Sequence, residues 1–174
     1  MLQMSLGAKA ILITDPRDFK HFFKQLHKHK FTVFAGVNTL FNRMIHYSGM
    51  SDVDFSFLKV TVGGGMAVQE HVAKAWKEKT GSPLLEGYGL TEASPVVCMN
   101  PLSNQQYNGS IGLPLPATDV KFLDDALNEL KVGEVGQLAV KGEQVMTGYW
   151  HQDEETKNVM TSDGYLLTGD IACV

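Results

Sequence analysis

The sequence has few cysteines, no long apolar run and no excess of basic residues. Two cysteines in 174 residues, Cys98 and Cys173, exclude a disulfide-rich secreted scaffold and a Cys-x-x-Cys zinc site. No apolar stretch reaches the roughly 18 residues that span a bilayer, and the start has no signal-peptide pattern. The formal net charge of −4 excludes a basic nucleic-acid footprint. We therefore expect a cytoplasmic protein with no nucleic-acid partner.

Hydrophobic residues make up 44% of the chain, which is ample for a buried core. In the first 100 residues, short apolar runs alternate with helical patterns three times, which is typical of a parallel sheet covered by helices. Ligands of such sheets usually lie at the carboxyl ends of the strands. The expected pairs are a run at 11–13 with a helix capped at Asp15 and reaching about His29, a strand at 31–36 with a helix capped by Asn38 or Thr39, and a strand at 58–65 with a helix that stops at Gly81.

The pattern changes after about residue 100 to short strands broken by Gly, Pro and Asp. Residues 101–116 are rich in proline and glycine and read as a connection. We therefore divide the α/β chain into a sheet subdomain at 1–100, the connection at 101–116, and a small β-rich subdomain, an antiparallel sheet or half-barrel, at 117–174.

The glycine run Gly63, Gly64 and Gly65 follows an expected strand and precedes an expected helix. Such a turn lets a ligand approach the backbone, with helix N–H groups directed at it. The spacing matches neither Gly-x-Gly-x-x-Gly nor a phosphate loop. A purely structural connection explains the run equally well.

The stretch GYGLTE at 87–92 offers an aromatic ring, a hydroxyl and a carboxylate at the end of another expected strand. Gly87 and Gly89 free the backbone around Tyr88, whose ring can stack on a purine. The Thr91 hydroxyl and the Glu92 carboxylate suit a phosphate and its Mg²⁺. The alternative is a tyrosine packed in the core followed by a Thr-x-x-Ser helix cap.

Asp170 ends the expected strand GYLLTGD. A carboxylate at a strand terminus can accept hydrogen bonds from the two vicinal hydroxyls of a ribose. An ordinary turn residue is the alternative. The six histidines have no spacing typical of metal ligands.

Several stretches together resemble the adenylate-forming enzymes, a superfamily that includes acyl-CoA synthetases, peptide-synthetase adenylation domains and luciferases. The resemblance runs over nearly the whole chain and is closest to the bacterial long-chain fatty-acid CoA ligases. The stretches that carry it are FAGVNTLFNRM at 34–44, FSFLKVTVGGGMAVQ at 55–69, LLEGYGLTEASPVV at 84–97, GSIGLPLP at 109–116, the segment 133–150 and GYLLTGDIA at 164–172.

The resemblance implies a role for each matching residue. Tyr88 and Gly89 would lie along adenine, Thr91 would reach the phosphate that becomes the adenylate, and Glu92 would help to hold Mg²⁺. The Gly63 to Gly65 turn would line the adenine pocket, and Asp170 would bind the ribose. Val37, Leu40 and Phe41 would line the acyl tunnel, although core packing explains these apolar residues equally well. The implied substrates are a fatty acid, ATP and coenzyme A.

The family also has two parts that this sequence does not contain. The Ser/Thr/Gly-rich phosphate loop is expected upstream of residue 1, and a hinge with a small C-terminal domain downstream of Val174. We therefore expect a central fragment of a fatty-acid CoA ligase that is inactive alone. The rival interpretations are a short-chain or aryl acid CoA ligase and a non-catalytic nucleotide-binding or partner-binding module. Peripheral contact with the inner face of the cell membrane and a homodimer are further expectations from the resemblance and from exposed apolar seams.

Overall fold

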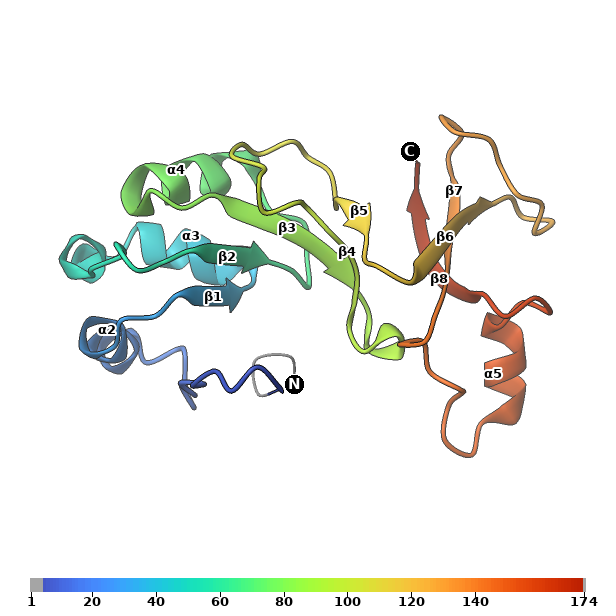
Figure 1. Cartoon of the computed structure of the whole chain (residues 1–174), viewed down its shortest axis with the longest axis horizontal. Helices are drawn as coiled ribbons and strands as arrows, with labels where there is room; N and C mark the ends of the chain where they lie inside the picture. Colours follow the sequence, from blue (N-terminus) through green and yellow to red (C-terminus); the bar gives the residue numbers. More distant parts are fainter. Residues whose placement is uncertain (1–4, 174) are drawn as a thin grey trace.

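The computed structural model describes residues 5–173 and has two lobes, each built on its own sheet (Figure 1). The first sheet has the order β1-β2-β3-β4-β5, and the second has the order β6-β7-β8. This arrangement confirms the expected α/β class, with helices on a partly parallel sheet followed by a small antiparallel sheet. The first-lobe strands are β1 (Val33–Gly36), β2 (Val60–Gly63), β3 (Leu84–Gly89), β4 (Val96–Met99) and β5 (Leu113–Pro114).

The first sheet changes direction at β3. β1, β2 and β3 run parallel, whereas β4 and β5 are antiparallel to their neighbours. The short 3-10 helix η2 (Thr91–Ala93) lies in the β3–β4 turn. The turn therefore carries the Thr91–Glu92 pair beyond the carboxyl end of β3.

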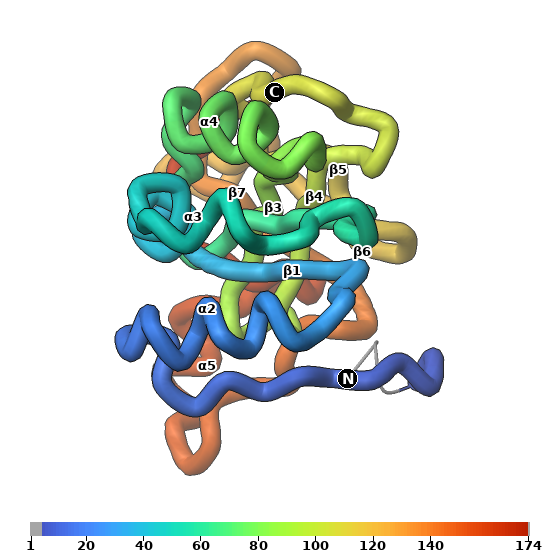
Figure 2. Tube along the Cα trace, turned by 90° about the vertical axis from the view of Figure 1, so that its left-hand side faces the viewer, coloured from blue at the N-terminus to red at the C-terminus, as the bar shows by residue number. Residues whose placement is uncertain are grey.

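The helices α2 (Phe19–Lys28), α3 (Asn38–Ile45) and α4 (Glu70–Thr80) lie along the first lobe (Figure 2). A 3-10 helix, η1 (Ser48–Asp52), follows α3. α4 ends as expected at Gly81, which adopts the left-handed conformation with φ 73°.

The structure corrects three details of the expected helices and strands. Residues 11–13 form no strand, and Leu12 is 87% exposed. α2 is capped by Asp18, whose Oδ1 accepts the His21 N–H at 3.0 Å, whereas Asp15 accepts the Arg17 N–H. Neither Asn38 nor Thr39 caps α3, because both lie inside the helix and the cap residue is Val37. The Asn38 Oδ1 instead accepts the N–H of Gln69 at 3.0 Å.

Aromatic rings dominate the core of the first lobe. Phe34 of β1 stacks on Trp76 of α4 with ring centroids 6.0 Å apart, and Phe41 of α3 meets Trp76 edge-on at 4.8 Å. Phe41 and Trp76 are fully buried. These contacts fix α3 and α4 against the strands whose carboxyl ends form the site.

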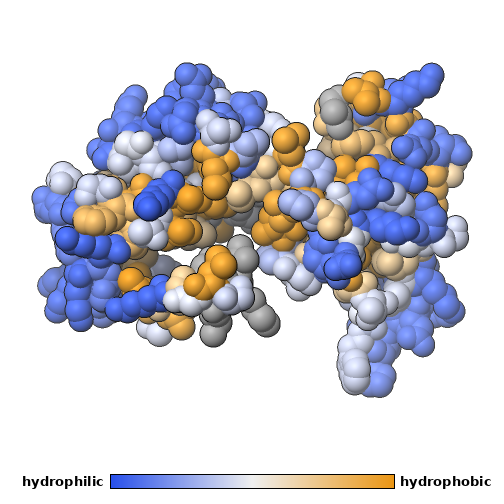
Figure 3. All heavy atoms as spheres, in the orientation of Figure 1, coloured by the Kyte–Doolittle hydropathy of each residue, from blue (hydrophilic) through white to orange (hydrophobic). Residues whose placement is uncertain are grey.

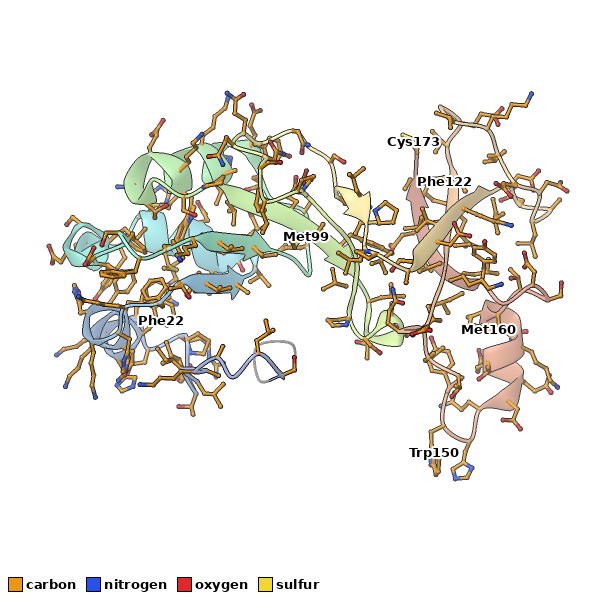
Figure 4. All side chains as sticks on the ribbon, viewed as in Figure 1. Phe22, Met99, Phe122, Trp150, Met160 and Cys173 are labelled. Carbon is orange, nitrogen blue, oxygen red and sulfur yellow. The ribbon has the colours of Figure 1, made fainter. Side chains whose placement is uncertain are left out.

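The second lobe is an antiparallel sheet with one flanking helix. Its elements are β6 (Thr118–Leu123), β7 (Gly136–Gly142), α5 (Asp153–Val159) and β8 (Leu166–Ala172). The strand-rich sequence pattern does not indicate α5, which is short and has no buried residue. Trp150 lies in the loop before α5 and points away from the lobe (Figure 4).

A second buried cluster joins the two lobes. Ala93, Val97 and Cys98 come from the first lobe, and Leu138 and Val140 come from β7. Figure 3 shows apolar surface where the lobes meet on this face. The β3–β4 turn is therefore packed against the second sheet, which fixes where the β8 side chains lie relative to β3.

Among residues 5–173, no helix is long and apolar enough to cross a membrane.

Candidate nucleotide site

The glycine turn lies at the carboxyl ends of the parallel strands. Gly63 at the end of β2 pairs with Glu86 of β3, and the Gly64 N–H donates to the Gly36 carbonyl at 3.1 Å. A Cβ at Gly64 would lie 3.4 Å from the Gly87 carbonyl oxygen. The turn and the GYGLTE stretch therefore meet at one sheet edge, as the sequence predicts.

Two of the three glycines have local structural reasons to be glycine. A Cβ at Gly63 would lie 2.5 Å from Cγ2 of Val68, and Gly65 has a φ of +74°. Gly64 is half-buried and a Cβ there would make only an ordinary contact. Close packing and turn geometry thus explain Gly63 and Gly65 without a ligand, which leaves Gly64 as the backbone position with room beside it.

Tyr88 of β3 and Asp170 of β8 meet across the junction of the two lobes. The Tyr88 hydroxyl donates to Oδ2 of Asp170 at 2.5 Å, although the two residues are 82 positions apart in sequence. Burial, and then this hydrogen bond, raise the pKa of Tyr88 to about 12. Its ring is half-buried and packs beside the inter-lobe cluster. The tyrosine is therefore neither a fully buried core residue nor free in solvent.

Asp170 lies inside a strand and not at a strand terminus, because β8 continues to Ala172. Its carboxylate is exposed, and its N–H donates to Oγ1 of Thr168 at 3.1 Å. The expectation of a strand-end carboxylate is wrong in this detail, as is the ordinary-turn alternative. An exposed strand carboxylate can still accept hydrogen bonds from a ligand.

Thr91 and Glu92 form the start of η2. Thr91 is exposed, and the residue that caps η2 is Leu90, which makes no side-chain cap bond. The helix-cap explanation of Thr91 therefore fails. Glu92 is half-buried, and its Oε1 accepts the Tyr149 hydroxyl at 2.8 Å.

The structure adds two residues that the sequence reasoning missed. Glu86 of β3 is 8% exposed; its Oε1 accepts the Val68 N–H at 3.1 Å, and its Oε2 is buried without a hydrogen-bond partner. Burial raises the pKa of this carboxyl. A charged residue inside the apolar strand LLEGYG is the signal that could have found it. Tyr149, the second addition, lies in the segment 133–150 that carries the resemblance, but no local pattern indicates that its partner is Glu92 in the other lobe.

The three acyl-tunnel candidates have different surroundings. Val37 is 41% exposed and lies beside the glycine turn, since a Cβ at Gly65 would be 3.6 Å from its Cγ1. Leu40 is half-buried near Gly36. Phe41 is fully buried against Phe34 and Trp76, so its contacts belong to the aromatic core.

Tyr88, Glu92 and Asp170 lie where the two lobes meet. A hollow of 630 Å³ lies on the second lobe beside Asp119, Lys141 and Tyr165, and none of the candidate residues lines it. Among residues 5–173, no group of three His, Cys, Asp or Glu side chains is arranged to hold a metal ion. A cation at this junction would therefore need ligands from a bound molecule as well as from Glu92.

The chain is similar to known proteins over nearly its whole length. A family model described as AMP-binding enzyme matches residues 1–150. A long-chain-fatty-acid–CoA ligase of Haemophilus influenzae is 49% identical over 171 residues, which are 98% of this chain and 30% of that protein. The ligase of the same name from Bacillus subtilis is 39% identical, again over 30% of its length. The chain thus spans about a third of the length of these relatives.

Solved structures show the same arrangement. Apo MatB from Rhodopseudomonas palustris matches 99% of the chain and 34% of its own, with a TM-score of 0.87 and 26% identity. The anthranilate CoA ligase AuaEII in complex with anthranoyl-AMP matches 97% of the chain and 32% of its own, with a TM-score of 0.87 and 27% identity. Both similarities include the two lobes and the junction between them.

Proposed function

Because this chain belongs to the AMP-binding enzyme family, we propose that it supplies the nucleotide contacts of an ATP-dependent long-chain fatty-acid CoA ligase. The observation that carries the proposal is the Tyr88–Asp170 hydrogen bond across the lobe junction. It brings an aromatic ring suited to a purine next to a carboxylate suited to ribose hydroxyls. The relatives named as long-chain-fatty-acid–CoA ligases support the choice of substrate.

The proposed reaction has two steps. The fatty-acid carboxylate oxygen attacks the α-phosphorus of ATP, the bond to the β-phosphate oxygen breaks, and pyrophosphate leaves. The coenzyme A thiolate then attacks the acyl carbonyl carbon, the bond to the phosphate oxygen breaks, and AMP leaves. Such transfers depend on positioning and on charge stabilisation around the phosphates. The candidate residues named above include no lysine or arginine, so we propose that this chain alone does not complete the reaction.

Glu92 fits the role of a Mg²⁺ ligand. Magnesium is usually held by one or two carboxylates together with substrate phosphates and water. Glu92 is half-buried, and among residues 5–173 its Oε2 accepts no hydrogen bond, so this oxygen is available. A bound Mg²⁺ would neutralise charge on the phosphates. Thr91, exposed beside it, would donate its hydroxyl to the α-phosphate.

Val37 is the acyl-contact candidate that the geometry favours most. It is exposed beside the glycine turn, where the acyl carboxylate would lie close to the adenylate phosphate. We propose that Leu40 continues the apolar lining and that Phe41 supports it from the core.

The substrates of this site would be the fatty acid, ATP and coenzyme A, and the reaction would take place in the cytoplasm. Contact with a membrane and a homodimer remain predictions.

Substitution of Asp170 tests the proposed ribose contact. We expect Asp170→Ala to weaken binding of a non-hydrolysable acyl-adenylate mimic by about 1 to 3 kcal/mol, because the ribose hydroxyls lose their acceptor. The measurement is calorimetric titration of the 174-residue chain. Asp125→Ala, at an exposed turn of the second lobe, is the matched control and should leave binding unchanged. Equal binding by the Asp170 variant and the unaltered chain would refute the ribose assignment.

A further inference from the structure

The second lobe holds Glu92 at two points. The Tyr149 hydroxyl donates to Glu92 Oε1 at 2.8 Å, and the Met146 N–H donates to the Glu92 carbonyl oxygen at 2.7 Å. One bond fixes the side chain and the other fixes the backbone. The segment between Met146 and Tyr149 therefore sets both the place and the direction of a carboxylate that belongs to the other lobe.

Tyr149 is itself held by α5. Its N–H donates to Oγ1 of Thr156 at 2.9 Å, and that hydroxyl donates onward to the Gln152 carbonyl at 2.9 Å. The hydroxyl thus ties the loop to the first turns of the helix. This bond fixes the backbone position from which the phenol reaches Glu92.

The bond from Tyr149 leaves one carboxylate oxygen available. Within the described part of the chain, Glu92 Oε2 accepts no hydrogen bond, whereas Oε1 is occupied by the phenol. A phenol that donates to one oxygen restricts rotation of the carboxylate and directs the other oxygen to one side. Partners of this kind commonly orient the carboxylates that bind metal ions, and they contribute to the affinity for the metal.

We propose that Tyr149 is a positioning residue that orients Glu92 toward a divalent cation bound together with the nucleotide phosphates. The inference rests on the proposed function, since it assumes that a metal–nucleotide complex occupies the junction. It adds a residue of the second lobe that supports the proposed metal site through Glu92. The phenol does not touch the cation; it acts through Glu92.

The test separates affinity for the metal from affinity for the nucleotide. The dissociation constant of a fluorescent ATP derivative is measured for the 174-residue chain in excess Mg²⁺ and again in EDTA. The dissociation constant in EDTA divided by the dissociation constant in Mg²⁺ reports how much the metal adds to the affinity for the nucleotide. We expect Tyr149→Phe to lower this ratio by roughly 10-fold or more, the usual effect of losing such a partner. The dissociation constant in EDTA should not change.

Three further variants test this result. Tyr165→Phe is the matched control, because Tyr165 also donates its hydroxyl to a carboxylate, that of Asp119, in the same lobe. It should leave the ratio unchanged. Glu92→Gln should bring the ratio close to unity, and Thr156→Val should lower it less than Tyr149→Phe does, because the phenol remains but its anchor is lost.

Four results would overturn the inference. An unchanged ratio in Tyr149→Phe, or an equal fall in Tyr165→Phe, would show that the phenol has no specific role at the metal. A loss of affinity in EDTA that matches the loss in Mg²⁺ would show a structural role only. If the unaltered chain bound the ATP derivative in neither buffer, the proposed nucleotide site would fail and this inference with it.

Discussion

At the scale of single residues, Glu86 is a buried carboxyl group with incomplete hydrogen bonding. It is 8% exposed and its Oε2 has no partner, and burial raises its pKa. A raised pKa means that the folded chain binds the proton more tightly than the unfolded chain does. The resulting stability is complete below the ordinary pKa of 4.5 and is lost as the pH rises through the folded value.

We therefore expect Glu86→Gln to increase the free energy of unfolding at pH 7, because the amide resembles the protonated acid and keeps an oxygen for the Val68 N–H. The gain should shrink as the pH falls toward 4.5. Urea denaturation at several pH values measures both effects. Glu78→Gln, at an exposed position of α4, is the control and should show no such gain. A destabilised Glu86→Gln at pH 7 would mean that the carboxylate has a favourable role not visible in its contacts.

The positions of several candidate residues could be predicted because these residues are close together in sequence. The ring, hydroxyl and carboxylate of Tyr88, Thr91 and Glu92 are adjacent in sequence, and the strand before them predicts where they lie. The partners of Asp170 and Glu92 could not be predicted in this way. They depend on how the second sheet packs against the first, and no periodicity within either lobe encodes that packing.

At the scale of elements, the β3–β4 hairpin depends on a close backbone approach. Gly89 is the last residue of β3, and a Cβ there would lie 2.0 Å from the Pro95 carbonyl oxygen. The Leu90 N–H donates to that same oxygen at 2.8 Å. Tyr88 precedes Gly89 in the chain and Thr91 follows it, so the geometry of the hairpin sets the distance between these two residues.

We expect Gly89→Ala to lower the free energy of unfolding by about 1 to 3 kcal/mol, the usual cost of overpacking. It should also weaken binding of the acyl-adenylate mimic. Denaturation and calorimetry measure the two effects. Gly64→Ala is the control for stability, because its nearest contact is an ordinary 3.4 Å. A Gly89→Ala protein as stable as the control would show that the hairpin can open without cost.

Strands with strong apolar patterns were predictable, and short or exposed elements were not. β1, β2 and β3 follow the expected runs, and β8 overlaps the expected strand GYLLTGD. β6 and β7 lie in the strand-rich segment that the sequence predicts after residue 100. β5 has only two residues, and α5 has no buried face, so neither leaves a periodic signal. The run at 11–13 is apolar but does not pair with a strand in the described chain, because apolar composition alone does not provide a neighbour.

At the scale of the whole molecule, the two lobes share one buried cluster. Leu138 of β7 is 2% exposed and packs with Val97 and Cys98 of β4. Trp76 is buried in the first lobe and so reports on that lobe. The first sheet reaches past residue 100 into the expected connection, because its last strand is β5 at Leu113–Pro114. The shared cluster couples the stability of the two lobes.

We expect Leu138→Ala to cost about 2 to 5 kcal/mol, the range for large-to-small changes in a core. Because both lobes share the cluster, the substitution should lower the urea midpoint of the whole chain and the urea midpoint of the first lobe by the same amount. Circular dichroism and tryptophan fluorescence in urea follow these two transitions, with Trp150→Phe as the background so that Trp76 alone is seen. Leu127→Ala, at a position 51% exposed, is the control. A shift seen by circular dichroism alone would show that the lobes unfold independently.

The hydrogen bond between Tyr88 and Asp170 links the binding of a molecule at the junction to the relative orientation of the two sheets. A molecule that contacts both residues binds best at one angle between β3 and β8, so it favours that angle over others. By thermodynamic reciprocity, anything that fixes the same angle favours the molecule by the same factor. The relative orientation of the two sheets and the affinity for such a molecule are therefore thermodynamically coupled.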